Sequence, residues 1–285
     1  NIKHGETFFF ISGTYRINNK EEKILISLKK GEKKIIKRNN KLYKKFSDHI
    51  GVIPLVIISP DDRNLIIEGS ETRRKFIDGI ICHTNKEYLN TLIDYNKTLK
   101  QRNALLKMFY NDSENIKKTI DIYDNHLSSN AQKICERRTE FLSDFIPIFK
   151  IRYKQLSDDK ENVEIIHKTD ISESQSLYKL LKNNLEKDLR FQFTTKGIHK
   201  DDLTFSINSF SVKKYGSQGQ QKTFLIALKL AQFDYLSKLN SNPILLLDDI
   251  FDKLDDNRVK QIINLVNEEK FNQIFISDTN KIRSE

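Results

Sequence analysis

The chain has 285 residues, a length that suits one large domain or two modest ones. Hydrophobic residues make up 38% and charged residues 31%, with 9 Gly and 4 Pro, and this composition argues against a fibrous or disordered protein. The net charge of +10 belongs almost entirely to residues 1–45, which carry 13 basic and 4 acidic side chains. No apolar run approaches the length of a membrane span.

The two cysteines give no sign of a disulfide or a metal site. Cys82 and Cys135 stand far apart without Cys-x-x-Cys or Cys/His spacing, so each is expected to be a small buried residue in a reducing compartment. Residues 1–19 lack the apolar core of a signal peptide, and a cytoplasmic location is expected. The chain begins with Asn1 rather than Met, which suggests a fragment.

Residues 7–58 are predicted to form strands. The runs Phe8–Gly13 and Lys23–Leu28 are rich in β-forming residues, and the pair Asn39-Asn40 marks a turn. This pattern predicts an antiparallel meander. A continuous apolar run, Val52–Ile58, is expected to be a buried or edge strand.

A basic run lies within the predicted meander. Its cationic side chains are Lys33, Lys34, Lys37 and Arg38. They form either an ordinary solvated face of the sheet or a contact for a phosphate-rich partner, and composition alone favours the solvated face.

Helical segments are predicted after the apolar run. Ser59 offers an N-cap, followed by Pro60 and two acidic residues, and a second helix start follows near Ser70. Residues 86–150 have the heptad-like apolar spacing of two antiparallel helices. Because Arg102 and Arg138 fall at seam positions, a short imperfect coiled coil and an ordinary helical subdomain explain the spacing equally well.

The last third of the chain is predicted to be α/β. The expected elements are a strand at 163–167, a helix at 174–185, strands at 191–194 and 203–207, a helix at 223–239, a strand at 244–247, a helix at 258–266 and a strand at 273–276. The final strand–helix–strand order predicts a parallel unit.

Two carboxylates follow the most apolar of these strands. Asp248 and Asp249 stand at the carboxyl end of Ile244–Leu247, where open α/β sheets bind ligands. One carboxylate there can hold Mg²⁺, directly or through water, and a second can orient or deprotonate a water. The start of a turn would explain the pair as well.

A polar loop with a glycine opens the long helix before this strand. Its sequence is Ser217-Gln218-Gly219-Gln220-Gln221-Lys222. The N–H groups and positive dipole end of a helix N-terminus suit a phosphate, and Gly219 allows close approach of the backbone. Ser217 and Gln220 also match a capping box, which needs no ligand.

Together, the loop and the acid pair resemble the ABC-type ATPases. The Ser-Gln-Gly-Gln loop, the strand ending in Asp248-Asp249 and the segment Lys253-Leu254-Asp255 stand in the order of signature loop, Walker B motif and D-loop. Within this group the chain resembles the RecF family, whose further blocks are similar to four other segments. These segments are Ile58–Asp62, Arg73–Asp78, Tyr95–Leu106 and Gly197–Asp202.

The resemblance implies an α/β fold. This fold is an ABC-type ATPase head, with a mixed or parallel sheet and an antiparallel meander, plus a helical, short coiled-coil-like subdomain. The implied parts are a β-rich part of the ATPase lobe at 1–70, a helical lobe with the helix pair at 71–160, and a C-terminal ATPase part at 161–285.

The resemblance also implies roles for single residues. Asp248 matches the acid that orders Mg²⁺ through water, and Asp249 matches the acid that positions the attacking water. The signature loop would contact the γ-phosphate of ATP held by a second protomer, with Asp255 at the same interface. The matching loop residues are Ser217, Gln218, Gly219 and Gln220.

The implied function is ATP-dependent DNA binding in recombinational repair, replication restart and the SOS response, by a weak ATPase. ATP and Mg²⁺ are the implied cofactors. ATP would join two heads into a homodimer that clamps DNA at junctions of duplex and single strand. RecR- and RecO-type mediators would help it load recombinase at gaps, with the basic run as the candidate phosphate contact.

The sequence departs from the family pattern in three places. No Gly-x-x-x-x-Gly-Lys-Ser/Thr loop is present, so these residues alone would not complete an ATP site. Ser277 and Thr279 stand where a switch histidine is usual, and Asp252 begins the D-loop. The alternative is a non-catalytic SMC-like head that serves as a protein-interaction module; a transporter ATPase would leave the family blocks unexplained.

His199 stands close to Asp201 and Asp202, an arrangement that suggests a metal or acid–base cluster. No further ligand has suitable spacing. A hydrogen-bonded structural histidine is therefore expected.

Overall fold

A computed structural model describes residues 2–17, 19–109, 113–157 (side chains from 119), 159–172, 175–239, 242–250, 259–261, 263–264 and 271–277. The chain divides into two compact units, Asn1–Ile53 and Pro54–Glu285. Among the described residues, no helix combines the length and the apolar character needed to cross a membrane.

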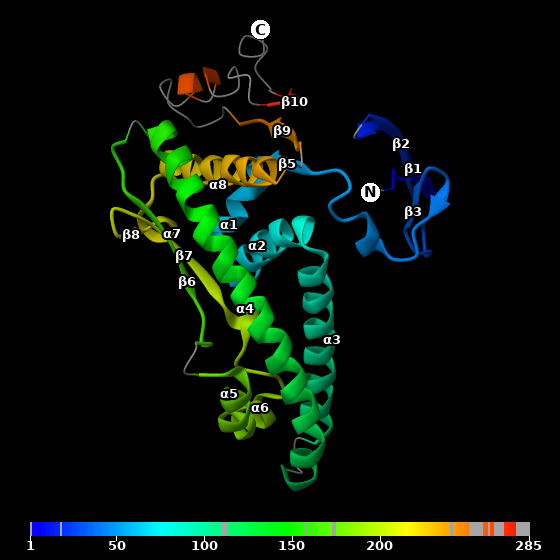
Figure 1. The fold of residues 1–285 in the computed structure, drawn as a ribbon, viewed down its shortest axis with the longest axis vertical. Helices are drawn as coiled ribbons and strands as arrows, with labels where there is room; N and C mark the ends of the chain where they lie inside the picture. The colour runs from blue at the N-terminus through cyan, green and yellow to red at the C-terminus, as the bar shows by residue number, and fades with distance from the viewer. Residues whose placement is uncertain are drawn as a thin grey trace. The chain divides into compact units, whose positions relative to one another are not determined.

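The first unit is an antiparallel meander, as predicted. Its strands β1 (Phe8–Ile17), β2 (Lys20–Lys29), β3 (Ile35–Arg38) and β4 (Lys41–Leu42) are hydrogen-bonded in that order (Figure 1). Asn39 and Asn40 form the turn between β3 and β4, and both have positive φ, as a two-residue type I′ hairpin requires. A short 3-10 helix, η1 (Phe46–His49), follows.

A three-stranded parallel sheet carries the acid pair in the second unit. Strand β9 (Ile244–Asp248) lies between β5 (Leu55–Ile58) and β10 (Ile274–Ser277). Both neighbours run parallel to β9, so the prediction of a parallel unit is confirmed for these strands, and their carboxyl ends meet at one edge. Strand β5 pairs in this sheet and not with the N-terminal meander.

Helix α8 (Gln218–Lys238) packs against β5 and against the long helix α4 (Ser113–Ser157). It begins before the predicted residue 223 because Ser217 caps it. Its apolar side chains surround most of the helix, as expected for a helix buried on several sides. The buried side chains are Gln221, Thr223, Phe224, Leu225, Ile226, Ala227, Leu228, Leu230, Ala231, Phe233 and Leu236.

The segment after β5 contains both predicted helix starts. Ser59 precedes η2 (Pro60–Arg63), where its N–H donates to Asp62 at 2.9 Å. Helices α1 (Asn64–Ile67) and α2 (Ser70–Thr84) follow. Asp62 also pairs with Lys229 of α8 at 2.7 Å, with both side chains largely buried, which holds this segment against α8.

The predicted antiparallel helix pair consists of α3 (Lys86–Met108) and α4 (Ser113–Ser157), which lie side by side in Figure 1. Asn85 caps α3 by accepting the Tyr88 N–H at 2.8 Å. Helix α4 has 45 residues, continues past the predicted end at 150 and packs against α8. There the Phe149 ring packs against Phe224, with ring centroids 4.8 Å apart.

A second, antiparallel sheet leads toward α8. It consists of β6 (Val163–Lys168), β7 (Asp202–Ile207) and β8 (Phe210–Ser211). The short helix α7 (Val212–Tyr215) then leads into the loop that caps α8. The predicted strands at 163–167 and 203–207 are confirmed.

Two predictions between β6 and β7 need correction. The helix expected at 174–185 is present as the shorter α5 (Leu177–Asn183), and a second helix, α6 (Leu185–Phe191), follows after Asn184. The strand expected at 191–194 is absent from these described residues, because α6 extends to Phe191 and Gln192 then takes a left-handed φ of 60°. The short 3-10 helix η3 (Ile198–Lys200) precedes β7. Of the helix predicted at 258–266, residues 259–261 and 263–264 are described and are helical, and the other four positions lie outside the described residues.

Both cysteines are free thiols. Cys82 is buried, as predicted, and burial raises the pKa of its thiol to about 12. Cys135 is only half-buried, so the prediction of burial is wrong there.

Candidate functional site

Asp248 and Asp249 lie where β9 ends at the edge of the parallel sheet. Asp248 is exposed, and the Ser277 hydroxyl on β10 donates to its carboxylate. Asp249 has a left-handed φ of 49°, and its N–H donates to the Ser277 carbonyl at 3.0 Å. Asp and Asn tolerate left-handed backbone better than most other residues with a side chain, so the local conformation favours a short acid at position 249.

Asp248 is a suitable protein ligand for Mg²⁺. In nucleotide sites, Mg²⁺ is held by one or two carboxylates, while phosphate oxygens and waters complete its octahedron. The described part of the chain contains no group of three or more His, Cys, Asp or Glu side chains that would form a cage of its own. A Mg²⁺ ion at Asp248 would therefore depend on phosphate oxygens for most of its ligands.

The predicted signature loop is organised by a capping box. Ser217 Oγ accepts the Gln220 N–H at 3.1 Å, and Gln220 Oε1 accepts the Ser217 N–H at 2.9 Å. Gln220 Nε2 also donates to Glu161 at 2.8 Å. These bonds fix the loop, and Gln218 and Gly219 fall in the first turn of α8, where N–H groups have no partner within the helix.

A cavity of about 150 Å³ lies between this loop, the end of β9 and the segment after β5. Its polar lining includes Ser59, Arg63, Gln218, Lys222 and Asp249. Lys222 Nζ lies 3.4 Å from the Asp249 carbonyl oxygen, so the second turn of α8 contacts the acid pair directly. The predicted residues outside the lining are Ser217, Gly219, Gln220 and Asp248.

Four polar residues that line this cavity were given no role at the site in the sequence analysis: Ser59, Arg63, Gln221 and Lys222. Lys222 ends the predicted signature loop segment, but its contact with Asp249 joins a helix to the end of a strand. The spacing of residues along the chain does not reveal such a contact. Ser59 and Arg63 belong to a helix start whose place beside β9 depends on the pairing of β5 with β9. The predicted residues Asp252, Asp255 and Thr279 lie outside the described residues.

The basic run of the first unit contains exposed and paired cations. Lys33, Lys34 and Lys37 are exposed. Arg38 instead forms a bidentate pair with Glu22 at 2.8 and 2.7 Å and lowers the pKa of that carboxyl to about 2. Arg38 therefore joins β3 to β2, a role that its place in the basic run did not reveal.

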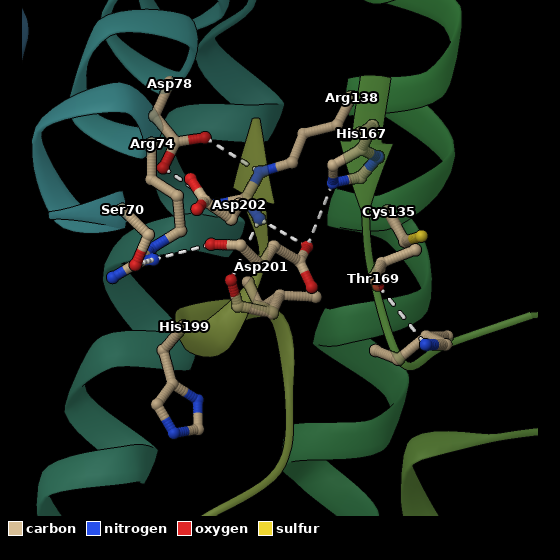
Figure 2. A network of polar contacts seen from close by, with 12 residues as sticks. Ser70, Arg74, Asp78, Cys135, Arg138, His167, Thr169, His199, Asp201 and Asp202 are labelled. Atoms are coloured by element: carbon tan, nitrogen blue, oxygen red, sulfur yellow. Dashed lines mark hydrogen bonds and ion pairs between the residues drawn. The ribbon is translucent and has the colours of Figure 1, made fainter. Parts of the chain in front are cut away.

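A buried ionic network joins α2, α4 and the start of β7 (Figure 2). Arg138 of α4 donates to Asp78 at 2.9 Å and to Asp201 at 2.8 Å. Arg74 donates to the Asp201 carbonyl at 2.6 Å, and His167 Nε2 lies 3.3 Å from the Asp201 carboxylate. Two of the RecF-like blocks thus meet around one arginine of α4, and β7 leads from this point through β8 and α7 to the signature loop.

A second buried arginine joins the third block to the same region. Arg102 of α3 donates to Asp124 at 2.6 Å, Asp188 at 2.7 Å and Thr194 at 2.8 Å. Asn103 accepts the Thr194 N–H at 2.8 Å. The seam positions of Arg102 and Arg138 are therefore ion-pair sites between the helices and the β6–β7 connection, rather than irregular coiled-coil contacts.

His199 is a hydrogen-bonded structural histidine, as expected. Its Nδ1 lies 2.8 Å from the Tyr95 hydroxyl, and its Nε2 lies 3.0 Å from the Thr194 carbonyl. Burial lowers the pKa of His199 to about 4, so the imidazole is neutral near pH 7.

Stability should fall through His199 as the pH drops below neutral. The unfolded chain takes up a proton near pH 6.5, whereas the folded chain resists it until about pH 4, so acid favours unfolding. The resulting loss is about 2 kcal/mol between pH 7 and pH 5. In urea denaturation, His199→Gln should lose correspondingly less stability over this range than the wild type. His126→Gln, at an exposed site on α4, is the control, and parallel curves for wild type and His199→Gln would contradict the assignment.

Comparison with known proteins gives close relatives. No protein-family model matches the chain. The DNA replication and repair protein RecF of Flavobacterium johnsoniae is 53% identical over 286 residues, which cover 100% of this chain and 79% of that protein. RecF of Porphyromonas gingivalis W83 is 41% identical over 283 residues, which cover 98% of this chain and 76% of that protein.

Solved structures agree on the architecture. The recombination mediator protein RecF with ATP, in the RecFOR pathway, matches with a TM-score of 0.85 and 31% identity over 98% of this chain and 77% of that one. An Smc head bound to the C-winged helix domain of ScpA matches with a TM-score of 0.52 and 12% identity over 98% of this chain and 68% of that one, a likeness of fold alone. The fold is therefore that of an ATPase head of the kind that RecF and SMC proteins share, as predicted. The chain belongs to the RecF family of DNA replication and repair proteins.

Proposed function

We propose that the protein is an ATP-dependent DNA-binding protein of recombinational repair and replication restart. The observation that carries this proposal is the acid pair at the end of β9, in contact with the helix that begins at the signature loop. Two comparisons support it: the relatives are DNA replication and repair proteins, and a RecF structure with ATP matches almost the whole chain.

In this proposal the site residues divide their roles between two protomers. Asp248 orders Mg²⁺ through water, and Asp249 positions the water that attacks the γ-phosphate. Mg²⁺, when bound, neutralises phosphate charge. The loop of one protomer, held by the Ser217–Gln220 capping box, offers its N–H groups to the γ-phosphate held by the other, with Asp255 at the same interface. The short reach of Asp249 suits the slow turnover of a weak ATPase that acts as a switch.

ATP would act by shifting a two-state equilibrium. Because each nucleotide would touch both protomers, ATP binds the homodimer better than the monomer and raises its population. The dimer would clamp DNA at junctions of duplex and single strand, and hydrolysis would release it. RecR- and RecO-type mediators are the proposed partners in loading recombinase, since the matching RecF structure belongs to the RecFOR pathway.

The exposed lysines of the first unit are the proposed phosphate contacts. Changing Lys33, Lys34 and Lys37 together to Gln should flatten the dependence of log K on log salt for duplex binding, by about 0.9 per lost phosphate contact. The measurement is fluorescence anisotropy of the complete gene product over a range of salt concentrations. An unchanged slope would reject this surface.

The chain offers a matched control for these variants. Lys86, Lys150 and Lys179 are also exposed, but they lie on helices of the second unit, so their combined change to Gln should leave the salt dependence intact. Arg38→Gln should instead destabilise the first unit, because it leaves Glu22 without its bidentate partner.

A further inference from the structure

Two phenylalanine rings lie exposed on the connection between α6 and β7. Phe191 is 45% exposed and Phe193 is 42% exposed. Their ring centroids are 5.8 Å apart, with an angle of 40° between the planes. Single exposed apolar side chains are ordinary, but two aromatic rings in contact form a surface that can receive another flat ring.

A cation lies over each ring. The Arg190 guanidinium lies 5.4 Å from the Phe191 centroid, and Lys200 Nζ lies 4.9 Å from the Phe193 centroid. Within the part of the chain that the structure describes, neither cation forms an ion pair. The positive charge over the rings is therefore available to an anionic partner.

The connection that presents the rings is held in one conformation. Thr194, directly after Phe193, is hydrogen-bonded to Asn103 and Arg102 of α3. The Thr194 carbonyl oxygen lies 3.0 Å from His199 Nε2. Gly197 has a φ of +131°, and an added Cβ there would lie 2.7 Å from the Tyr95 hydroxyl. The buried network thus fixes the loop, so a ligand would not have to order it on binding.

We propose that Phe191 and Phe193 form a stacking platform for the unpaired bases of single-stranded DNA, with Arg190 and Lys200 contacting the adjacent phosphates. Bases of single strands stack on aromatic side chains next to cationic groups, whereas the bases of a duplex are already stacked on each other. The two cations favour a polyanion over an apolar protein segment. This proposal rests on the proposed function for DNA as the partner, and it adds a site on the helical part of the second unit.

The absence of tryptophan from the sequence allows a direct test. Phe193→Trp places the one fluorescent indole of these 285 residues at the platform. An oligo(dT) strand should quench this fluorescence, and an abasic strand of equal length should not, because stacking requires the base. Ile122→Trp, at a 65% exposed position on α4, is the control and should not respond.

Two results would overturn the proposal. One is no quenching of Phe193→Trp at oligo(dT) concentrations that saturate binding; the other is equal quenching by the abasic strand. A second variant does not depend on fluorescence: Phe191→Ala/Phe193→Ala should weaken oligo(dT) binding about tenfold or more and leave duplex binding unchanged. Because both side chains are nearly half exposed, this variant should fold, with a melting temperature close to that of the wild type.

The same measurements separate this proposal from the proposed function. If the double variant binds oligo(dT) as well as the wild type does, while the lysine variant shows its flattened salt dependence, only the stacking platform is rejected. A wild-type protein that binds neither oligo(dT) nor duplex rejects both.

Discussion

Arg138→Met should lower the free energy of unfolding by about 3–5 kcal/mol, the range for removing one partner of a buried ion pair. Arg138 is almost wholly buried and donates to the carboxylates of Asp78 and Asp201. Met approximates the volume of the arginine stem but leaves both carboxylates without their cation. This loss is a large part of the roughly 5–15 kcal/mol that is the usual free energy of unfolding of a domain. Urea denaturation measures the loss.

The neighbouring arginine provides a matched control. Arg137 lies on the exposed side of α4 and pairs with Glu140 at 2.6 Å, with both side chains about half exposed. Arg137→Met should cost less than about 1 kcal/mol, as exposed pairs do. A similar small cost for Arg138→Met would show that the network in Figure 2 does not stabilise the second unit.

Asp249→Asn should trap ATP-bound dimers of the complete gene product and slow hydrolysis by roughly 10²–10⁴-fold, the usual contribution of a positioned acid or base. The amide keeps the size of the side chain but cannot accept a proton from the attacking water. Asn also tolerates the left-handed backbone at position 249, so the variant should fold normally.

Two variants make the test of Asp249 specific. Asp248→Asn should reduce nucleotide binding and should make that binding less dependent on Mg²⁺. Asp249→Asn should leave nucleotide binding intact. The rate of phosphate release measures ATP turnover by each variant, and light scattering measures the fraction of protein that is dimeric. If Asp249→Asn binds ATP but stays monomeric, the role proposed for Asp249 is wrong.

Local patterns in the sequence predicted the elements that carry the candidate site. The apolar run before Asp248 predicted a buried strand, Ser217 predicted the cap of α8, and Ser59 predicted the start of the 3-10 helix η2. These predictions succeed because a cap or a buried strand depends on residues close together in the chain. The antiparallel helix pair was predictable for the same reason, since its apolar spacing repeats over many turns.

Contacts between distant segments could not be predicted from spacing. Arg138 falls at an apolar seam position, which signals a buried charge, but its partner Asp201 is 63 residues away. Arg38 lies in a basic run, and nothing local shows that Glu22 across the sheet engages it. The Phe-x-Phe pattern at 191–193 matches a strand, yet α6 ends at Phe191, Gln192 is left-handed, and Thr194 is held to α3 by Asn103.

The mass of the complete gene product in solution, with and without ATP, tests the central claim most directly. Sedimentation velocity in the presence of Mg²⁺ should show a monomer with ADP and a dimer with ATP, and Asp249→Asn should shift the equilibrium further toward the dimer. A protein that binds ATP to saturation and still sediments as a monomer would contradict the account of an ATP-dependent clamp.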